Sequence, residues 1–293
     1  MKRSTIKILK IILPLTLGVF LIWYSVNSAT PLEREQIWDN ITSAQPGWIF
    51  LSLIFGLLAH LSRAYRWKFL LEPLGYVPRF RNSFMAVMVG YLANFGIPRS
   101  GEVLRAVTIS GYDDIPFEKA FGTIISERVA DFVMLMLIIG IVFLLQTEYL
   151  LTYFIENEIN PLITIGILFM LLGIGVMILK FIKRAKTGIL LKVKTFAKGL
   201  LEGMRSILKM KNKGAFLFHT MFIWIMYILM FYILIYTIPE TSQMEIGVVM
   251  VAFVVGSFAI SATNGGIGVY PVAIGASLML FDISKESGEA FGW

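Results

Sequence analysis

The chain has 293 residues, 57% of them hydrophobic and 15% charged, with no cysteine and a mean hydropathy of +0.76. Soluble domains are about 25% charged, so this composition excludes an ordinary soluble protein. In a membrane protein, basic residues mark the cytoplasmic ends of the helices, and this accounts for the net charge of +7. No nucleic-acid partner is therefore expected. Without cysteine, disulfides and thiolate metal sites are excluded, and the two histidines lie far apart in the sequence, so no metal or cofactor is expected.

Several apolar runs have the length of about 20 residues that a membrane-spanning helix needs. They are Ile8 to Val26, Gly47 to Leu71, Ala120 to Leu145, Pro161 to Lys180 and Gly214 to Ile238. The first run is either a cleavable signal peptide or a retained helix, and its length favours the retained helix. We therefore expect an all-α polytopic membrane protein with about six or more membrane helices, forming a single domain over residues 1–293.

Loop charges orient these helices, because Lys and Arg concentrate in cytoplasmic loops. The N-terminus is basic, and so is the segment 181–213, whose amphipathic pattern suits either a helix on an anionic membrane surface or a connector helix. With both in the cytoplasm, residues 81 and 118 lie on the same side, and too few residues separate them for two full crossings. We expect a re-entrant hairpin over about residues 82–110 that turns at "GIPRSG". The alternative is a short full crossing over 82–97, with the following charges in an outside loop.

A second interruption, "SATNGGIGVYP", divides the apolar stretch of about 246–281, since three glycines and a proline will not hold a continuous helix. The stretch is either two short crossings or a second re-entrant hairpin that enters from the opposite side. Two such hairpins in inverted arrangement are typical of transporters, whose substrate site lies where they meet. Asn264, Gly265, Gly266 and Tyr270 are therefore candidate substrate-lining residues. The alternative for them is close helix packing around small residues.

Charged residues at membrane depth usually face the protein interior and mark a pathway or a structural pair. The candidate substrate-binding residues are Arg63, Arg99, Ser100, Glu102, Arg105, Glu127, Arg128 and Asp131, with His60 beside them. Arginine binds phosphate through two parallel hydrogen bonds, and a half-helix that begins at Gly101, with Ser100 as its N-cap, offers free N–H groups. Arg99 is the best single candidate for a phosphate contact. Alternatively, these residues form an ion-pair network that only fixes the hairpin, and Arg66 extends to the membrane interface.

Four motifs occur in order: "RAYRWKFLL", "YLANFGIPRSGEVLRA", "SERVADF" and "NGGIGVYPVA". In this the chain resembles the membrane region of lysylphosphatidylglycerol synthases and related stand-alone flippase-like membrane proteins. The resemblance covers nearly the whole chain and implies lipid handling without the cytosolic aminoacyl-transferase domain of the synthases. Family members often carry an acidic residue where "VYP" stands here, at Tyr270 and its neighbours.

The leading hypothesis is a flippase-type lipid transporter in the cell membrane, with a cytoplasmic N-terminus, that moves an anionic or modified phospholipid or a lipid-linked precursor between leaflets. Arg99, Arg105 and Arg128 would hold the headgroup phosphate, and Glu127 and Asp131 are candidate proton carriers. The alternatives are a membrane enzyme acting on a lipid phosphate or polyprenyl-linked sugar, and a non-transporting partner subunit. A homo-oligomer or a partner lipid-modifying enzyme is also compatible with the sequence. The ending "KESGEAFGW" resembles the start of another helix, so a further C-terminal span is expected.

Overall fold

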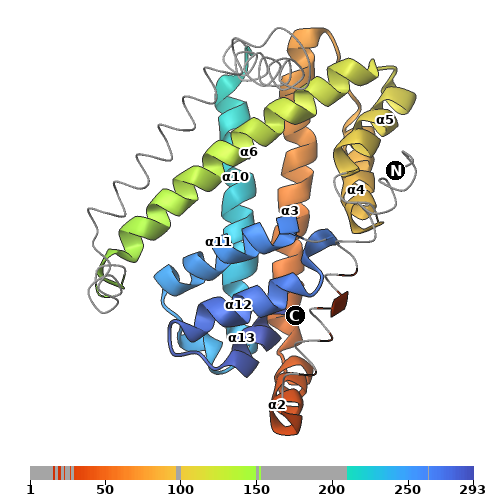
Figure 1. Ribbon diagram of the computed structural model, residues 1–293. Coiled ribbons are helices and arrows are strands. Elements are labelled where there is room, and N and C mark those ends of the chain that lie inside the picture. The colour runs from red at the N-terminus through yellow and green to blue at the C-terminus, as the bar shows by residue number, and fades with distance from the viewer. Residues whose placement is uncertain are drawn as a thin grey trace, which may run out of the picture. The chain divides into compact units, whose positions relative to one another are not determined.

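Every regular element that the computed structural model describes is a helix, and no strand occurs among the described residues (Figure 1). The described residues are 16, 19, 20, 23, 27, 30–96, 100–149, 152, 210–262 and 264–293. Within them, three segments are long and apolar enough to cross a membrane: Pro46–Leu74, Phe117–Leu145 and Lys213–Thr237. The prediction of an all-α membrane protein is thereby confirmed.

Four of the sequence predictions lie outside the described residues, entirely or almost so. They are the first apolar run from Ile8 to Val26, the run from Pro161 to Lys180, the basic segment 181–213 up to residue 209, and Arg99 at the predicted tip of the hairpin.

The chain divides into two compact units, one made of residues 1–124 and 210–293 and the other of residues 125–209. The helix α6 (Phe117–Leu145) begins in the first unit and continues into the second. All other helices described below belong to the first unit.

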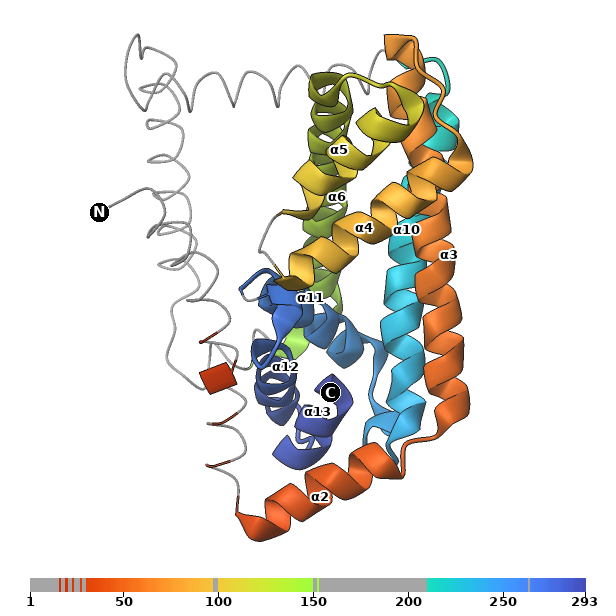
Figure 2. The same ribbon diagram turned by 90° about the vertical axis from the view of Figure 1, so that its right-hand side faces the viewer.

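The first unit is built on two long helices, α3 (Pro46–Leu71) and α10 (Lys213–Tyr232), which lie side by side (Figure 2). They run antiparallel, because the hydroxyl of Ser52 near the start of α3 donates to the carbonyl of Met230 near the end of α10 at 2.9 Å. Proline in the first turn of α3 costs no hydrogen bond, since the N–H groups there have no helical partner. The 3₁₀ turns η1 (Glu72–Leu74) and η2 (Ile233–Thr237) extend the two helices at their carboxyl ends.

The helices α4 (Phe80–Gly96) and α5 (Gly101–Asp113) pack against each other as a hairpin. Their bounds agree with the helices predicted on either side of "GIPRSG". Glycines allow the close approach: a Cβ added to Gly101 would collide with the carbonyl oxygen of Gly90 and lie 2.7 Å from the amide nitrogen of Asn94. The helical pair is confirmed, whereas its re-entrant placement in a membrane stays a prediction.

The second predicted interruption is also observed. Helix α11 (Ile246–Ala262) ends there, a 3₁₀ turn η4 (Asn264–Gly266) follows, and α12 (Val269–Met279) packs back on α11. Gly265, Gly266 and Gly268 have φ values of 65°, 84° and 74°, in a region that only glycine adopts without strain. Helix α4 contacts η4, and its carboxyl end lies beside it in both side views (Figures 1 and 2). The helix that precedes the first interruption therefore meets the second interruption within the first unit.

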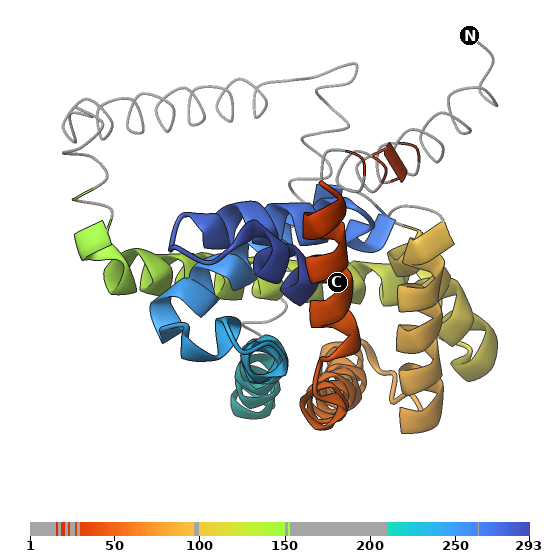
Figure 3. The same cartoon turned by 90° about the horizontal axis from the view of Figure 1, so that it is seen from below.

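Two short helices complete the first unit. Helix α2 (Pro31–Thr42) lies between the first two apolar runs and was not predicted, and it packs against α13 (Lys285–Gly292), as Figure 3 shows. A capping box starts α2, since Thr30 accepts from the N–H of Glu33 while the Glu33 carboxylate accepts from the N–H of Thr30. That signal, "TPLE", is legible in the sequence. Helix α13 covers the ending "KESGEAFGW" from Lys285 to Gly292, and the further C-terminal span expected there stays a prediction.

A carboxylate fixes the start of α13. Glu240 directly precedes the 3₁₀ turn η3 (Thr241–Gln243), and Ser284 directly precedes α13. The N–H and hydroxyl of Ser284 donate to the carboxylate of Glu240 at 2.7 and 2.6 Å. Burial acts to raise the pKa of Glu240, but these hydrogen bonds, together with one from Ser287, outweigh it and hold the pKa below its ordinary value.

Candidate functional site

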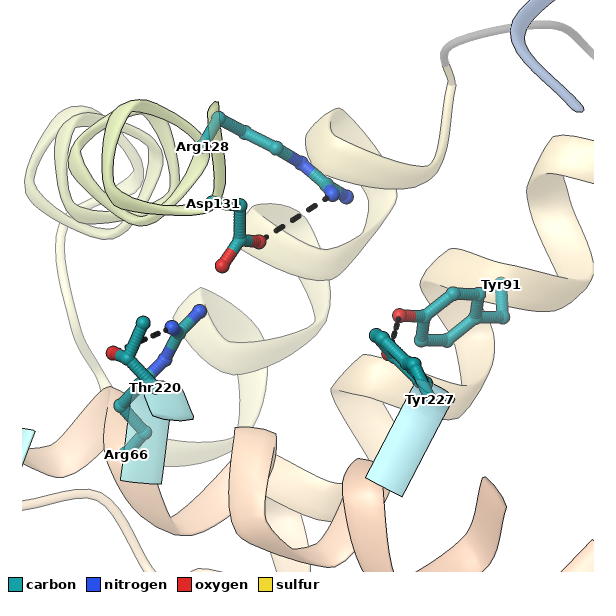
Figure 4. Close-up of polar contacts among 6 residues, drawn as sticks. All are labelled: Arg66, Tyr91, Arg128, Asp131, Thr220 and Tyr227. Carbon is teal, nitrogen blue, oxygen red and sulfur yellow. Dashed lines mark hydrogen bonds and ion pairs between the residues drawn. The ribbon is translucent and has the colours of Figure 1, made fainter. Parts of the chain in front are cut away.

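Two arginines of α3 are buried inside the first unit. Arg63 is 3% exposed and Arg66 is fully buried. Arg66 and Trp67 follow Arg63 by three and four residues, so all three side chains lie on one face of the helix. Extension to the membrane interface was one alternative for Arg66; in the structure its side chain is buried, and its Nη1 donates to the hydroxyl of buried Thr220 on α10 at 2.9 Å (Figure 4). A partner 154 residues away in the sequence therefore holds this charge inside.

Helix α5 contributes a third buried guanidinium to the same region. Arg105 is 5% exposed, and its Cζ lies 4.0 Å from the centroid of the Trp67 ring. Such a cation–π contact contributes about 2 kcal/mol where water is excluded. The indole Nε1 of Trp67 donates to Thr123 at the start of α6, at 2.9 Å, which fixes the plane of the ring. Trp67 thus connects the arginines of α3 with the arginine of the hairpin.

Aromatic side chains extend the polar region along α3. The hydroxyls of Tyr91 on α4 and Tyr227 on α10 are hydrogen-bonded at 3.1 Å (Figure 4). The ring of His60 lies 4.4 Å from that of Tyr91, and Arg63 Cζ lies 5.9 Å from the Tyr227 ring. Among the described residues, the buried Nδ1 of His60 has no hydrogen-bond partner. The hairpin is thereby attached to both long helices through polar groups.

The hairpin turn differs in one detail from its prediction. Ser100 occupies the N-cap position of α5, but its side chain does not cap the helix and instead donates to the carbonyl of Ala93 at 3.1 Å. Asn94 at the end of α4 supplies the acceptor, since its Oδ1 takes the N–H of Gly101 at 2.8 Å. The cap role assigned to Ser100 was wrong, because its hydroxyl donates back to α4, and the side-chain acceptor at the start of α5 is Asn94, which takes the N–H of Gly101. Glu102 is half-buried in the first turn of α5.

The acidic motif "SERVAD" lies on the part of α6 that belongs to the second unit. Glu127 and Asp131 are 1% and 8% exposed, and Arg128 pairs with Asp131 at 3.9 Å (Figure 4). This is one contact of the kind that the alternative of an ion-pair network requires. A role of these residues in binding a substrate stays a prediction.

The second interruption shows close packing. A Cβ added to Gly256 of α11 would lie 2.7 Å from the ring of Tyr270, and one added to Gly266 would lie 3.1 Å from the Cβ of Tyr270. This agrees with the alternative of helix packing around small residues. Asn264 and Gly265 form the turn η4 itself. Their part in lining a substrate path stays a prediction.

The chemistry of the first unit suits an anion. Three buried guanidinium groups around Trp67 present planar N–H donors that match the geometry of phosphate. Over the described ranges, no group of three or more His, Asp or Glu side chains is placed to hold a metal ion. Arg66 and the Tyr91–Tyr227 pair were not predicted. Only the spacing of Arg66 three residues after Arg63 pointed to a shared buried face.

Comparisons with known proteins agree with this architecture. A family model described as "Lysylphosphatidylglycerol synthase TM region" matches residues 11–292. Among curated proteins, the chain is 31% identical over 124 residues to the UPF0104 membrane protein MJ1595 of Methanocaldococcus jannaschii, a match that covers 41% of this chain and only 34% of that relative. No solved structure matches the chain significantly. The chain belongs to the lysylphosphatidylglycerol synthase TM-region family and is a membrane protein.

Proposed function

We propose that this protein is a lipid transporter of the flippase type. It moves an anionic or modified phospholipid, or a lipid-linked precursor, between the leaflets of the cell membrane, with several passes and a cytoplasmic N-terminus. The observation that carries the proposal is the set of three buried arginines, Arg63, Arg66 and Arg105, in and beside helices apolar enough to span a membrane. A charge at the bilayer centre costs at least about 2.5–3.5 kcal/mol, so such residues are retained for a function or a firm structural pairing.

The transported group would be a phosphate whose oxygens accept hydrogen bonds from these guanidinium groups. Its acyl chains would remain in the lipid, since only the headgroup needs a polar path. The contact between α4 and η4 supports this proposal, because interrupted helices that meet are where transporters of inverted architecture bind substrate. Arg99, Arg128, Glu127 and Asp131 remain proposed participants, the two acids as proton carriers.

The test is lipid translocation in proteoliposomes that contain the full chain. A fluorescent phosphatidylglycerol is placed in both leaflets, and a membrane-impermeant quencher reports how much of it reaches the outer leaflet. We expect Arg105→Gln to slow translocation at least about ten-fold, because a hydrogen bond to a charged group contributes about 1.5–3 kcal/mol. Arg105→Lys keeps the charge and loses the two-pronged geometry, so an intermediate rate is expected.

The matched control is Arg34→Gln, the same substitution at an exposed arginine of α2, which should leave the rate unchanged. Thermal unfolding of each variant separates a transport defect from loss of the fold. A chain that moves no anionic lipid, or an Arg105→Gln variant that is folded and as fast as the wild type, contradicts the proposal.

A further inference from the structure

An open groove of about 290 Å³ runs along the surface of the first unit between α3 and α10. Its walls are Leu58 and Tyr65 of α3, Phe218 and Phe222 of α10, and Phe80 at the start of α4. Both long walls are helices long and apolar enough to span a membrane, so a groove between them suits a hydrocarbon chain. Its size is close to the lower end of the range of small-molecule pockets, about 300–1,000 Å³.

The lining of this groove contains one polar pair. Ser62 and the Nδ1 atom of His219 are hydrogen-bonded at 2.8 Å. When the Ser62 hydroxyl donates to Nδ1, the imidazole carries its proton on Nε2, which is then a donor. Within the described part of the chain, Nε2 makes no hydrogen bond. In this tautomer, a ligand in the groove can receive one hydrogen bond from His219.

The depth of His219 suits the boundary between the polar and apolar parts of a lipid. It lies six residues after Lys213, the first residue of α10, which is about 9 Å along the helix. Basic residues gather at this end of the two long helices: Lys68 in the last turn of α3, Arg79 and Arg81 around the start of α4, and Lys211 and Lys213 at the start of α10. Two acids also lie at this end: Glu72 at the start of η1, and Asp113 at the end of α5, which accepts from the N–H of Arg79 and from Asn82. The basic residues named above outnumber them.

We propose that this groove is a binding site for one acyl chain of an anionic glycerophospholipid. The chain lies against the aromatic walls, the ester oxygen accepts from His219 Nε2, and the phosphate lies among the basic residues at the rim. The site is separate from the buried arginines around Trp67. This inference rests on the proposed function only in that the ligand is a membrane lipid. The groove would bind that lipid on the outer surface of the first unit whether or not translocation follows.

The experiment uses the purified full chain in detergent and a phosphatidylglycerol that carries a photoactivatable diazirine in one acyl chain. After illumination, mass spectrometry locates the labelled residues. We expect saturable labelling concentrated on the groove walls, Phe222 above all, and several-fold weaker labelling at Ile225, an exposed apolar residue of α10 outside the groove. Unlabelled phosphatidylglycerol should compete better than phosphatidylcholine.

Two variants test the site itself. Leu58→Trp fills the groove from an exposed position and should reduce labelling of Phe222 several-fold, whereas Ile225→Trp, its matched control, should not. His219→Phe removes the donor and should weaken competition by phosphatidylglycerol. Labelling that does not saturate, that is equal at Phe222 and Ile225, or that survives Leu58→Trp overturns the proposal. Saturable labelling of a chain that translocates no lipid would refute the transport function and leave this site standing.

Discussion

The pairing of Arg66 with Thr220 gives a stability prediction that can be worked from the structure. Both side chains are buried, at 0% and 3% exposure, and the guanidinium donates to the threonine hydroxyl at 2.9 Å. Thr220→Val preserves the shape of the side chain and removes the acceptor. A hydrogen bond to a charged group contributes about 1.5–3 kcal/mol, so we expect the free energy of unfolding to fall by about 2–3 kcal/mol. The unfolding equilibrium constant then rises about 30- to 140-fold.

The control must account for a second hydrogen bond, because the Thr220 hydroxyl also donates to the carbonyl of Phe216 in the preceding turn. Thr108→Val in α5 removes the same kind of bond, from Thr108 to the carbonyl of Leu104 at 2.8 Å, at an exposed site without an arginine. Its cost should be small, since such backbone bonds in helices contribute little.

The assay is denaturant unfolding of the full chain in mixed micelles. It compares the single variants Thr220→Val, Thr108→Val and Arg66→Leu with the double variant Arg66→Leu/Thr220→Val. Coupling between the two sites should appear as a double variant less destabilised than the sum of Arg66→Leu and Thr220→Val. Equal costs for Thr220→Val and Thr108→Val, or additive effects in the cycle, would refute the assignment of Thr220 as the group that holds Arg66 inside.

Three further outcomes are expected in the same unfolding assay. Gly101→Ala should destabilise by about 1–3 kcal/mol because its methyl group meets backbone of α4, whereas Gly111→Ala, with open space around it, should be neutral or stabilising by up to about 1 kcal/mol. Tyr91→Phe and Tyr227→Phe should each cost about 0.5–1.5 kcal/mol, and the double variant no more than the larger single one, since one hydrogen bond joins them. The pKa of Glu240 is lowered by folding, so its stabilisation is present at neutral pH and is lost as the pH falls through that pKa; the difference in melting temperature between wild type and Glu240→Gln should close over that range.

The helices and their interruptions could be predicted from the sequence because their signals are local. Long apolar runs gave α3, α6 and α10 within a few residues, and glycine with proline gave both breaks. The capping box at Thr30 and Glu33 is equally local, so the start of α2 is also encoded in the sequence around it.

The direction of a buried charge could not be predicted, because it depends on partners distant in sequence. From α3 alone, Arg66 can either reach the interface or turn inward, and its partners on the inside include Thr220, which is 154 residues away in the sequence, and the ring of Phe216 at 5.3 Å. The same holds for Tyr91 and Tyr227, which are 136 residues apart. A sequence period identifies the face on which a residue lies, but not the hydrogen bond that it makes there.

The cap at Asn94 changes where an anion is best held. The sequence favoured the turn of the hairpin, where a helix that begins at Gly101 would offer free N–H groups. In the structure the N–H of Gly101 already donates to Asn94, and Glu102 places a carboxylate in the first turn, where it interacts with the positive end of the helix. A phosphate at that turn would have to displace one group and face the charge of the other. A guanidinium group has five N–H donors, so an arginine can keep one contact, as Arg66 does with Thr220, and still donate to a phosphate. We therefore expect loss of Arg105 to impair anion binding more than loss of the Ser100 hydroxyl.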